Sequence, residues 1–422
     1  MSAPRNIILL SADALRSDHL SCYGYDRETS PFLDDFAESN IRFQHSYSGS
    51  ANTREGVPAL ITGKYPDVAI GANYRLDTEP IASVLRNSGY ETGAFHSNPY
   101  ASRAYGMDRG FDKFDDDLNF GKNKWLALAQ RAFDKLRNKH YVRADEINER
   151  SLSWLDEVGD SPFFLWNHYM DTHGPYEPVP EFRKQFESRS ISDRNAQQLY
   201  QRAIRDPESI TDDELDLLIN LYDAEILYLD SRIERFIAAL DERGLLDNSL
   251  IVFTADHGDA FGEHGYFEHP RYLHDELVRV PMIVSTPDST PIENTTTAVS
   301  TLDVAATMCD YADIEWDGPG ESLLALAETS QGDRIVFSQI RGEDEDKHVR
   351  RYAARDGSHT AYAEYDAKTE AITITETDSR SLSDALREHI RGRVDNIEVA
   401  DEDDDIDDSE INRRLTALGY KE

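Results

Sequence analysis

Cysteine and long hydrophobic runs are both scarce in this chain of 422 residues. The two cysteines, Cys22 and Cys309, are too few for a disulfide framework, so we expect two reduced and mostly buried thiols. No stretch is apolar for the roughly 20 residues that a membrane-spanning helix needs. The apolar run at residues 7–10 is too short for the roughly 7–15-residue core of a secretory signal. These absences predict a cytoplasmic protein without a membrane span.

Lysine is also rare, supplying 10 of the 44 basic residues, while Asp and Glu total 81 and the net charge is −37. Acidity spread over the whole chain, with arginine in place of lysine, predicts a high-salt cytoplasm, because concentrated salt screens self-repulsion. A basic partner for the acidic surface is the weaker alternative, since the charge is not confined to one face or tail. The same charge argues against nucleic acid as a ligand, because phosphate backbones bind basic patches.

Apolar runs predict buried strands at residues 6–12, 92–95, 163–168, 249–254 and 280–284. Four of these runs end beside ionisable or metal-capable residues, among them Asp13, His168 and Asp256. Helical spacing predicts helices at residues 31–39, 79–88 and 215–240, the last with Gly244 just past its end. The alternation favours an α/β fold whose chemistry lies at the carboxyl edge of a parallel sheet.

The sequence pattern changes after residue 330, where short strand-like segments replace the long apolar runs. Short strands are predicted at 334–339, 351–354, 359–365 and 371–375, which fit a small antiparallel sheet. Residues 401–408 form an acidic run typical of a solvated loop, and residues 411–418 return to a helical pattern. We therefore predict a catalytic α/β domain over residues 1–330 and a small subdomain over residues 331–422.

Asp256-His257-Gly258 is the strongest local signal for a metal site. A carboxylate and an imidazole on adjacent residues can both face a metal if the backbone turns sharply, and we expect Gly258 to permit that turn. Asp13 alone would more often be a helix N-cap. Its place at the end of the first strand, with Asp256-His257 ending a later one, favours a shared metal site instead.

Several segments, taken in order, resemble the sulfatase family of the alkaline phosphatase superfamily: NIILLSADALRSDHLSCYGY, TSPFLDDFAE, SANTREGVPALITGKYP, GYETGAFHSNPY, YMDTHGPYEP, VFTADHGDAFGEHGYFEH, VRVPMIV, VSTLDVAATMCDYADI and RRLTALGY. The resemblance covers nearly the whole chain and, with the acidic composition, suggests a haloarchaeal-type member. It implies an alkaline-phosphatase-like fold, with a mostly parallel central sheet flanked by helices and a small C-terminal antiparallel subdomain. The implied activity is hydrolysis of a sulfuric or phosphoric ester of a small molecule or glycan.

Carried over by position, the family's metal ligands fall on Asp13, Asp256 and His257. Many sulfatases have a second Asp where this chain has Ala14. Nitrogen ligation by His257 shifts the expected divalent metal from Ca²⁺, which remains the alternative, towards Mn²⁺ or Zn²⁺.

The family's nucleophile position, a Cys or Ser that is oxidised to formylglycine, is held here by Thr53. Threonine cannot form formylglycine, so the resemblance implies that Thr53 itself binds the metal and attacks the ester. Two alternatives are a helix cap at Thr53 and an earlier register that places Ser50 at the nucleophile position.

Other matched positions suggest further roles. His269 and His173 are candidates for protonating the leaving oxygen, and Asn98, Arg54 and His264 for binding the anionic ester. Each of these residues has a purely structural alternative. A second metal held by Asp171, His168 and His173, as in two-zinc phosphodiesterases, is a weaker alternative.

Two other functions compete with hydrolysis. One is transfer of a phospho-group to an alcohol, as in the threonine-bearing phosphoglycerol transferases, although those are membrane-anchored. The other is a binding protein that kept the fold without the activity, against which the joint presence of Asp13, Thr53, Asp256 and His257 counts.

Overall fold

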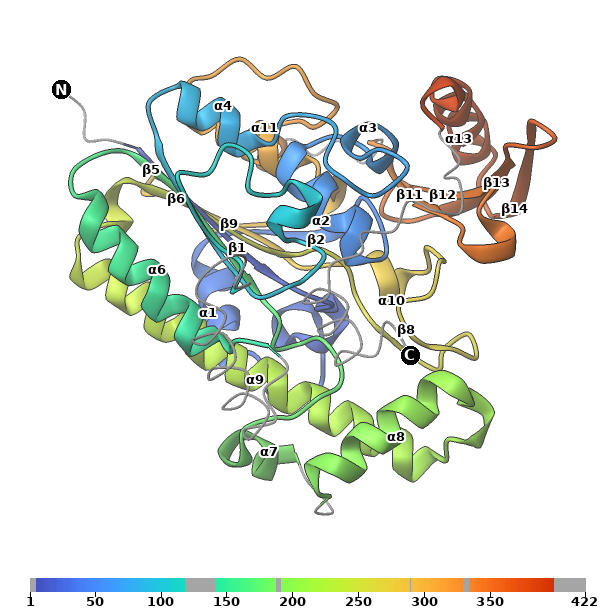
Figure 1. Ribbon diagram of the computed structural model, residues 1–422, viewed down its shortest axis with the longest axis horizontal. Helices are drawn as coiled ribbons and strands as arrows, with labels where there is room; N and C mark the ends of the chain where they lie inside the picture. Colours follow the sequence, from blue (N-terminus) through green and yellow to red (C-terminus); the bar gives the residue numbers. More distant parts are fainter. Residues whose placement is uncertain (1–4, 118–140, 187–190, 289, 329–333, 398–422) are drawn as a thin grey trace, which may run out of the picture.

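The computed structural model describes residues 5–117, 141–186, 191–288, 290–328 and 334–397. Its centre is an eight-stranded sheet with the strand order β10-β2-β9-β6-β1-β5-β3-β4 (Figure 1). The strands are β1 (Asn6–Ala12), β2 (Ile41–Tyr47), β3 (Glu91–Phe95), β4 (Lys113–Asp115), β5 (Phe163–Tyr169), β6 (Ser249–Ala255), β9 (Met282–Ser285) and β10 (Ile292–Ser300). Only β9 runs antiparallel to its neighbours in this sheet, which confirms the predicted mostly parallel α/β fold.

Helices cover both faces of the sheet. One face carries α1 (Pro31–Ser39), α6 (Ala144–Val158), α7 (Pro180–Phe186), α8 (Asp193–Arg205) and α9 (Asp212–Glu242). The other carries α2 (Thr53–Thr62), α3 (Pro66–Ala69), α4 (Ile81–Asn87), α11 (Asp303–Tyr311) and α12 (Leu323–Ala327). Successive side chains of β1 enter opposite cores, Ile8 on the α9 side and Ile7 on the α2 side. A strand covered on both faces therefore reads as a continuous apolar run.

The predicted helices at 31–39, 79–88 and 215–240 correspond to α1, α4 and α9. Gly244 follows the end of α9 with a φ of 66°, as a helix stop signal should. None of the helices among the described residues is long and apolar enough to cross a membrane.

The four strands predicted after residue 330 form a second, antiparallel sheet. They are β11 (Val336–Arg341), β12 (Val349–Arg355), β13 (Thr360–Asp366) and β14 (Ala371–Thr377), and α13 (Arg380–Arg391) packs on them. The predicted domain boundary at 330 and 331, the acidic run at 401–408 and the helix at 411–418 lie outside the described residues. The division into two domains therefore stays a prediction.

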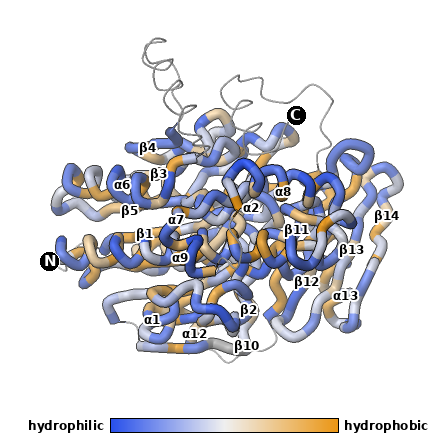
Figure 2. Tube along the Cα trace, turned by 90° about the horizontal axis from the view of Figure 1, so that it is seen from below, coloured by the Kyte–Doolittle hydropathy of each residue, from blue (hydrophilic) through white to orange (hydrophobic). Residues whose placement is uncertain are grey.

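The small sheet packs directly against the loop that leads into α2. The Gln339 backbone N–H donates to the Gly49 carbonyl at 3.0 Å, and the Ser338 hydroxyl donates to the Ser48 carbonyl at 2.6 Å. A hairpin of β7 (Ala260–Phe261) and β8 (Phe267–Glu268), followed by α10 (Asp275–Val278), lies next to this junction (Figure 1). In Figure 2 the outer turns are mostly hydrophilic, while hydrophobic residues alternate along the layers. The loops at this junction surround the candidate active site.

Candidate active site

Three neighbouring strands bring ionisable residues to one edge of the large sheet. Asp13 follows β1, Asp256 follows β6, and His168 lies near the end of β5. The register pairs Ala12 with both Tyr169 and Ala255, so the three strands end side by side. All three ionisable side chains are fully buried. The predicted meeting of Asp13 and Asp256 is confirmed.

Backbone contacts of Asp13 and of its neighbour Ala14 fix the turn after β1. Ala14 adopts a left-handed backbone conformation with a φ of 58°, which is rare for a residue with a side chain. Its N–H points at Asp256 Oδ1, 3.4 Å away, and the Thr172 hydroxyl donates to the Asp13 carbonyl at 2.6 Å. These contacts connect the turn after β1 to the Asp256 carboxylate and to the residues after β5.

Two glycines let other segments approach Asp256 and the residues after it. A Cβ on Gly56 would lie 2.6 Å from the Asp256 carbonyl, so this glycine lets α2 approach Asp256 closely. A Cβ on Gly258 would lie 2.1 Å from the Glu276 carbonyl. Gly258 is therefore needed for its contact with α10, and the predicted role in a sharp turn does not account for it.

Thr53 is the first residue of α2 and is buried. Its Oγ1 lies 3.2 Å from His257 Nε2 and 3.5 Å from Asp13 Oδ2. The N-cap of α2 is Asn52, so the alternative in which Thr53 caps this helix is wrong. The start of α2 thus points a hydroxyl at the cluster of carboxylates and imidazole.

The spacing of these groups fits a divalent metal. His257 Nε2 is 3.5 Å from both Asp13 Oδ1 and Asp256 Oδ2. Two ligands about 2.0–2.2 Å from a tetrahedral metal would be about 3.3–3.6 Å apart. Those two carboxylate oxygens are buried and accept no hydrogen bond from the described residues. Buried carboxylate oxygens that accept no hydrogen bond are the atoms to which a cation would bind.

The second oxygen of Asp13 is held by neutral or weakly basic groups. Asn98 Nδ2 donates to Asp13 Oδ2, and His168 Nε2 lies 3.2 Å from the same atom. His168 Nδ1 in turn contacts the Ser11 hydroxyl at 2.9 Å. His168 also forms a group with Asp13 and Asp256 whose ligand atoms lie within 4.8 Å of one another. The sequence interpretation considered His168 only for a second metal, although its position at a strand end already indicated this edge.

The pKa values of the two carboxyl groups shift in opposite directions. Burial alone would raise the pKa of Asp13, but the adjacent His173, His168 and His257 outweigh it and hold that pKa well below its ordinary value. Burial and the charge of Asp13 raise the pKa of Asp256 well above its ordinary value. Two carboxylates this close cannot both ionise easily unless a cation lies between them.

His173 and His269 stand beside His257. Their ring centroids are 5.2 Å apart, and that of His269 is 4.6 Å from that of His257. Burial and the neighbouring imidazoles lower the pKa of His269 well below its ordinary value. Asp259 Oδ1 lies 3.7 Å from His269 Nδ1, and burial raises the pKa of Asp259 to about 6. The predicted pair of proton-transfer histidines is therefore at the cluster.

A cavity of about 360 Å³ opens above Thr53, between α2, the β8 loop and the β11–β12 loop. Its lining includes Asn52, Thr53, Arg54, Tyr100, Tyr266, Phe267, Glu268, His269, Pro270, Arg271 and Glu343. Arg54 ion-pairs with Glu343 at 3.0 Å and hydrogen-bonds the Tyr100 hydroxyl at 2.5 Å. Arg271, which the sequence interpretation missed, pairs with Glu343 and, at 3.2 Å, with Glu55. The cavity thus presents cations of the kind that bind an anionic ester.

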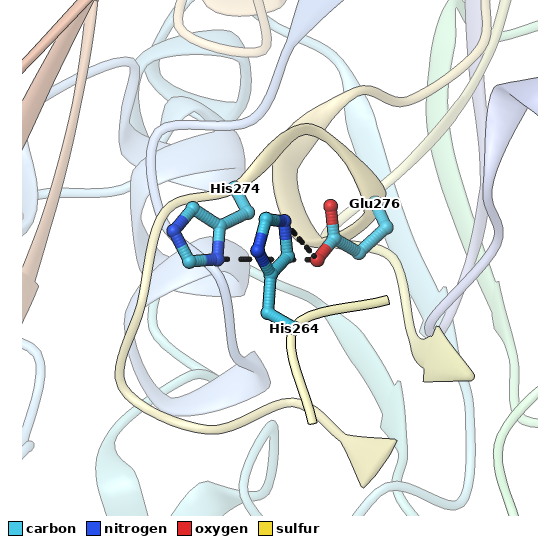
Figure 3. Close-up of side chains that lie close together, drawn as sticks. All are labelled: His264, His274 and Glu276. Carbon is cyan, nitrogen blue, oxygen red and sulfur yellow. Dashed lines mark ion pairs between the residues drawn. The ribbon is translucent and has the colours of Figure 1, made fainter. Parts of the chain in front are cut away.

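Two predicted assignments do not fit this geometry. His264 lies away from the Thr53 cavity, half exposed, in a separate group with His274 and Glu276 (Figure 3). The contribution of Asp171 to a second metal is also unsupported. Its Oδ1 is 2.9 Å from Arg143 Nε, and its Oδ2 accepts the Ala144 N–H at 3.0 Å. Both of its oxygens are engaged away from His168.

Comparison with known proteins identifies the family. The family model described as Sulfatase matches residues 5–314. This chain belongs to the sulfatase family. It is 22% identical over 393 residues to an N-acetylglucosamine-6-O-sulfatase of Bacteroides thetaiotaomicron, covering 74% of this chain and 68% of that protein. It is 25% identical over 377 residues to the uncharacterized sulfatase YidJ of Escherichia coli, covering 80% and 74%.

Solved structures share the fold of this sulfatase-family chain. A protein in complex with its substrate D-glucosamine-2-N,6-O-disulfate superposes with a TM-score of 0.71 at 18% identity, covering 95% of this chain and 100% of that one. The phosphonate monoester hydrolase of Agrobacterium radiobacter superposes with a TM-score of 0.69 at 18% identity, covering 93% and 95%. The alkaline-phosphatase-like fold predicted from the sequence is confirmed.

Proposed function

We propose that this sulfatase-family enzyme hydrolyses a sulfuric or phosphoric ester with Thr53 as the nucleophile and a divalent metal at Asp13, Asp256 and His257. The observation that carries the proposal is the position of Thr53 Oγ1, 3.2 Å from His257 Nε2 at the floor of an open cavity. Asp13 Oδ1 and Asp256 Oδ2, both buried, lie at ligand spacing from the same nitrogen. A divalent cation bound there would lower the pKa of the Thr53 hydroxyl and neutralise charge on the transferred group.

The side chains around the proposed metal have separate roles in the reaction. Thr53 Oγ1, once its proton has passed to solvent, attacks the sulfur or phosphorus of the ester, and the bond to the alcohol oxygen breaks. His269 donates the proton that the leaving alkoxide needs; a bound anionic ester raises the pKa of this imidazole again. Water then cleaves the resulting Thr53 ester and releases inorganic sulfate or phosphate. Asn98 and His168 keep Asp13 oriented throughout.

Arg54 is placed to bind the anionic part of the substrate at the cavity wall. Its guanidinium is 4.4 Å from the ring centroid of Tyr100 and 5.1 Å from that of Tyr74, so its planar face is already positioned by two aromatic rings. An arginine held in this way loses little freedom when it binds an anion.

The proposal is tested with p-nitrophenyl sulfate, phosphate monoester, phosphodiester and phosphonate, each with Mn²⁺, Zn²⁺, Ca²⁺ or EDTA. The assays are run in molar KCl because the net charge of −37 favours a high-salt setting. We expect turnover with Mn²⁺ or Zn²⁺ on at least one ester and none with EDTA. Adding glycerol distinguishes hydrolysis from transfer, since a transferase would form the glycerol ester instead of inorganic anion.

Replacement of the nucleophile is the sharpest variant. Thr53→Ala removes the attacking oxygen, and we expect kcat to fall roughly 10⁴-fold or more. Thr53→Ser keeps a hydroxyl at the same position and retains part of the activity. Unchanged turnover in Thr53→Ala, with the protein folded by circular dichroism, would rule out this nucleophile.

A further inference from the structure

A second group of metal-ligating side chains lies outside the Thr53 cavity. His264 follows β7, His274 is the N-cap of α10, and Glu276 belongs to the first turn of that helix. Figure 3 shows the three side chains converging. Each offers one ligand atom, and these atoms lie within 4.8 Å of one another. The group is separate from the ligands proposed above.

We propose that His264, His274 and Glu276 form a second divalent-metal site that prefers Zn²⁺. Two imidazoles and one carboxylate are an established zinc ligand set, with a water in the remaining position. His264 Nε2 is 3.3 Å from Glu276 Oε1, close to the about 3.3–3.6 Å expected between two ligands of one tetrahedral zinc. His274 Nδ1 is 3.9 Å from the same oxygen, and the His274 ring stacks on that of His264 with centroids 3.8 Å apart, so one imidazole must rotate for both to bind the same ion.

The surroundings of the three residues suit an ion. A hollow of about 430 Å³ beside them is also lined by hydroxyls and carboxylates, including Thr360 and Glu376 of the small sheet. The side chain of His264 is 47% exposed and that of Glu276 8% exposed, so an ion can enter from solvent and still bind a sheltered carboxylate. The Tyr266 hydroxyl contacts His274 Nδ1 and lies 3.3 Å from Glu276 Oε1, so a bound ion would displace it from these atoms.

The position of His264 and His274 in the sequence links this site to the Thr53 cavity. Residues 264 and 274 flank the segment that carries His269 and Arg271 into the Thr53 cavity. The ring of His274 also packs edge-on against Tyr362 of β13, with centroids 5.6 Å apart. A zinc ion would close this segment into a short loop and hold it against α10 and the small sheet. The site therefore acts as a clamp on a wall of the cavity.

Metal counting tests the proposal independently of catalysis. Protein stripped with EDTA is dialysed against Zn²⁺, and bound zinc is measured by elemental analysis. We expect two equivalents in the wild type and one in His264→Ala and in Glu276→Gln. His359→Ala, which removes a half-exposed histidine paired with Asp356, serves as the matched control and keeps two.

The outcomes separate the two sites. If the wild type binds a single equivalent that Asp256→Asn removes and His264→Ala leaves in place, the clamp is refuted and the proposed function stands. A single equivalent that His264→Ala removes and Asp256→Asn leaves supports the clamp and contradicts the metal at Thr53. The clamp also predicts that zinc slows tryptic cleavage after Arg271 in the wild type but not in His264→Ala; equal protection in both would overturn it.

Discussion

The Asp13–Asp256–His257 cluster and the His264–His274–Glu276 cluster use the same kinds of side chain in opposite surroundings. Every side chain of the first is fully buried, whereas in the second only Glu276 is largely sheltered from solvent. Burial makes each ionised carboxylate of the first cluster costly unless a cation accompanies it. Water can hydrogen-bond to the exposed imidazole of the second cluster. We expect from this comparison that burial, more than ligand identity, decides how strongly each proposed site depends on its metal.

Among the variants that compare the two clusters, the largest effect is expected from Asp256→Asn, which removes a proposed metal ligand. Turnover should fall by about 10³-fold or more, because the nucleophile loses its activation. The melting temperature of the EDTA-treated protein should rise by about 2 °C or more, since two close carboxylates no longer compete for ionisation. Calorimetry with and without metal measures both the rise and the loss of the metal-induced shift.

Glu276→Gln is the matched change at the half-exposed cluster. The melting temperature of its metal-free form should move by less than about 1 °C, because Glu276 faces His264 and the Tyr266 hydroxyl and no second carboxylate of its own cluster. A rise as large as that of Asp256→Asn would show that the two clusters do not differ in the way their burial implies.

His269→Gln should have the next largest effect. Removing the proton donor lowers kcat by about 10²-fold for an ester with a poorly leaving alkyl alcohol, and much less for p-nitrophenol, which leaves without a proton. The comparison variant is His359→Gln, whose half-exposed side chain pairs with Asp356 outside the cavity and should not change the ratio of the two rates. Equal sensitivity to the leaving group in both variants would contradict the assignment of His269.

The smallest effect is expected at Arg54. Arg54→Gln should raise KM about tenfold with little change in kcat, because the guanidinium binds the anionic group in the ground state and the transition state alike. Arg54→Lys should lie between the two, since it keeps the charge but loses the fork that pairs with Glu343 and Tyr100. A fall in kcat at unchanged KM would instead place Arg54 in the chemical step.

The strands were predictable where both faces are covered. β1, β5 and β6 are buried along their whole length, so their sequences are apolar runs. β2 and β10 were missed because their sequences, IRFQHSY and IENTTTAVS, contain polar residues and no such run. β10 is an edge strand, where one side of the ladder is open and the pressure for apolar residues is weaker.

The candidate site was predictable only in part. The lining of the cavity combines Tyr100, Arg271 and Glu343 from three distant segments, and no spacing in the sequence relates them. His264 stands in a motif that resembles the family, yet the β7–β8 hairpin turns it towards Glu276. A hairpin's orientation depends on what it packs against, here the Tyr222 ring of α9, 5.1 Å from that of Phe261, and Glu276 of α10.

The sequence by itself determined that Asp13 and Asp256 would meet, because parallel strands that end together place the residues after them at one edge. The resemblance also predicts Thr53, in place of an oxidisable Cys or Ser, at the nucleophile position, and this stays a prediction. Only the tertiary structure decided which side chain each carboxylate faces. His168 contacts Asp13, whereas Asp171 pairs with Arg143. The physical reason is that the positions of buried strands along the chain follow from the local hydrophobic pattern, whereas the order of the strands in the sheet and the pairing of side chains depend on packing between segments distant in sequence.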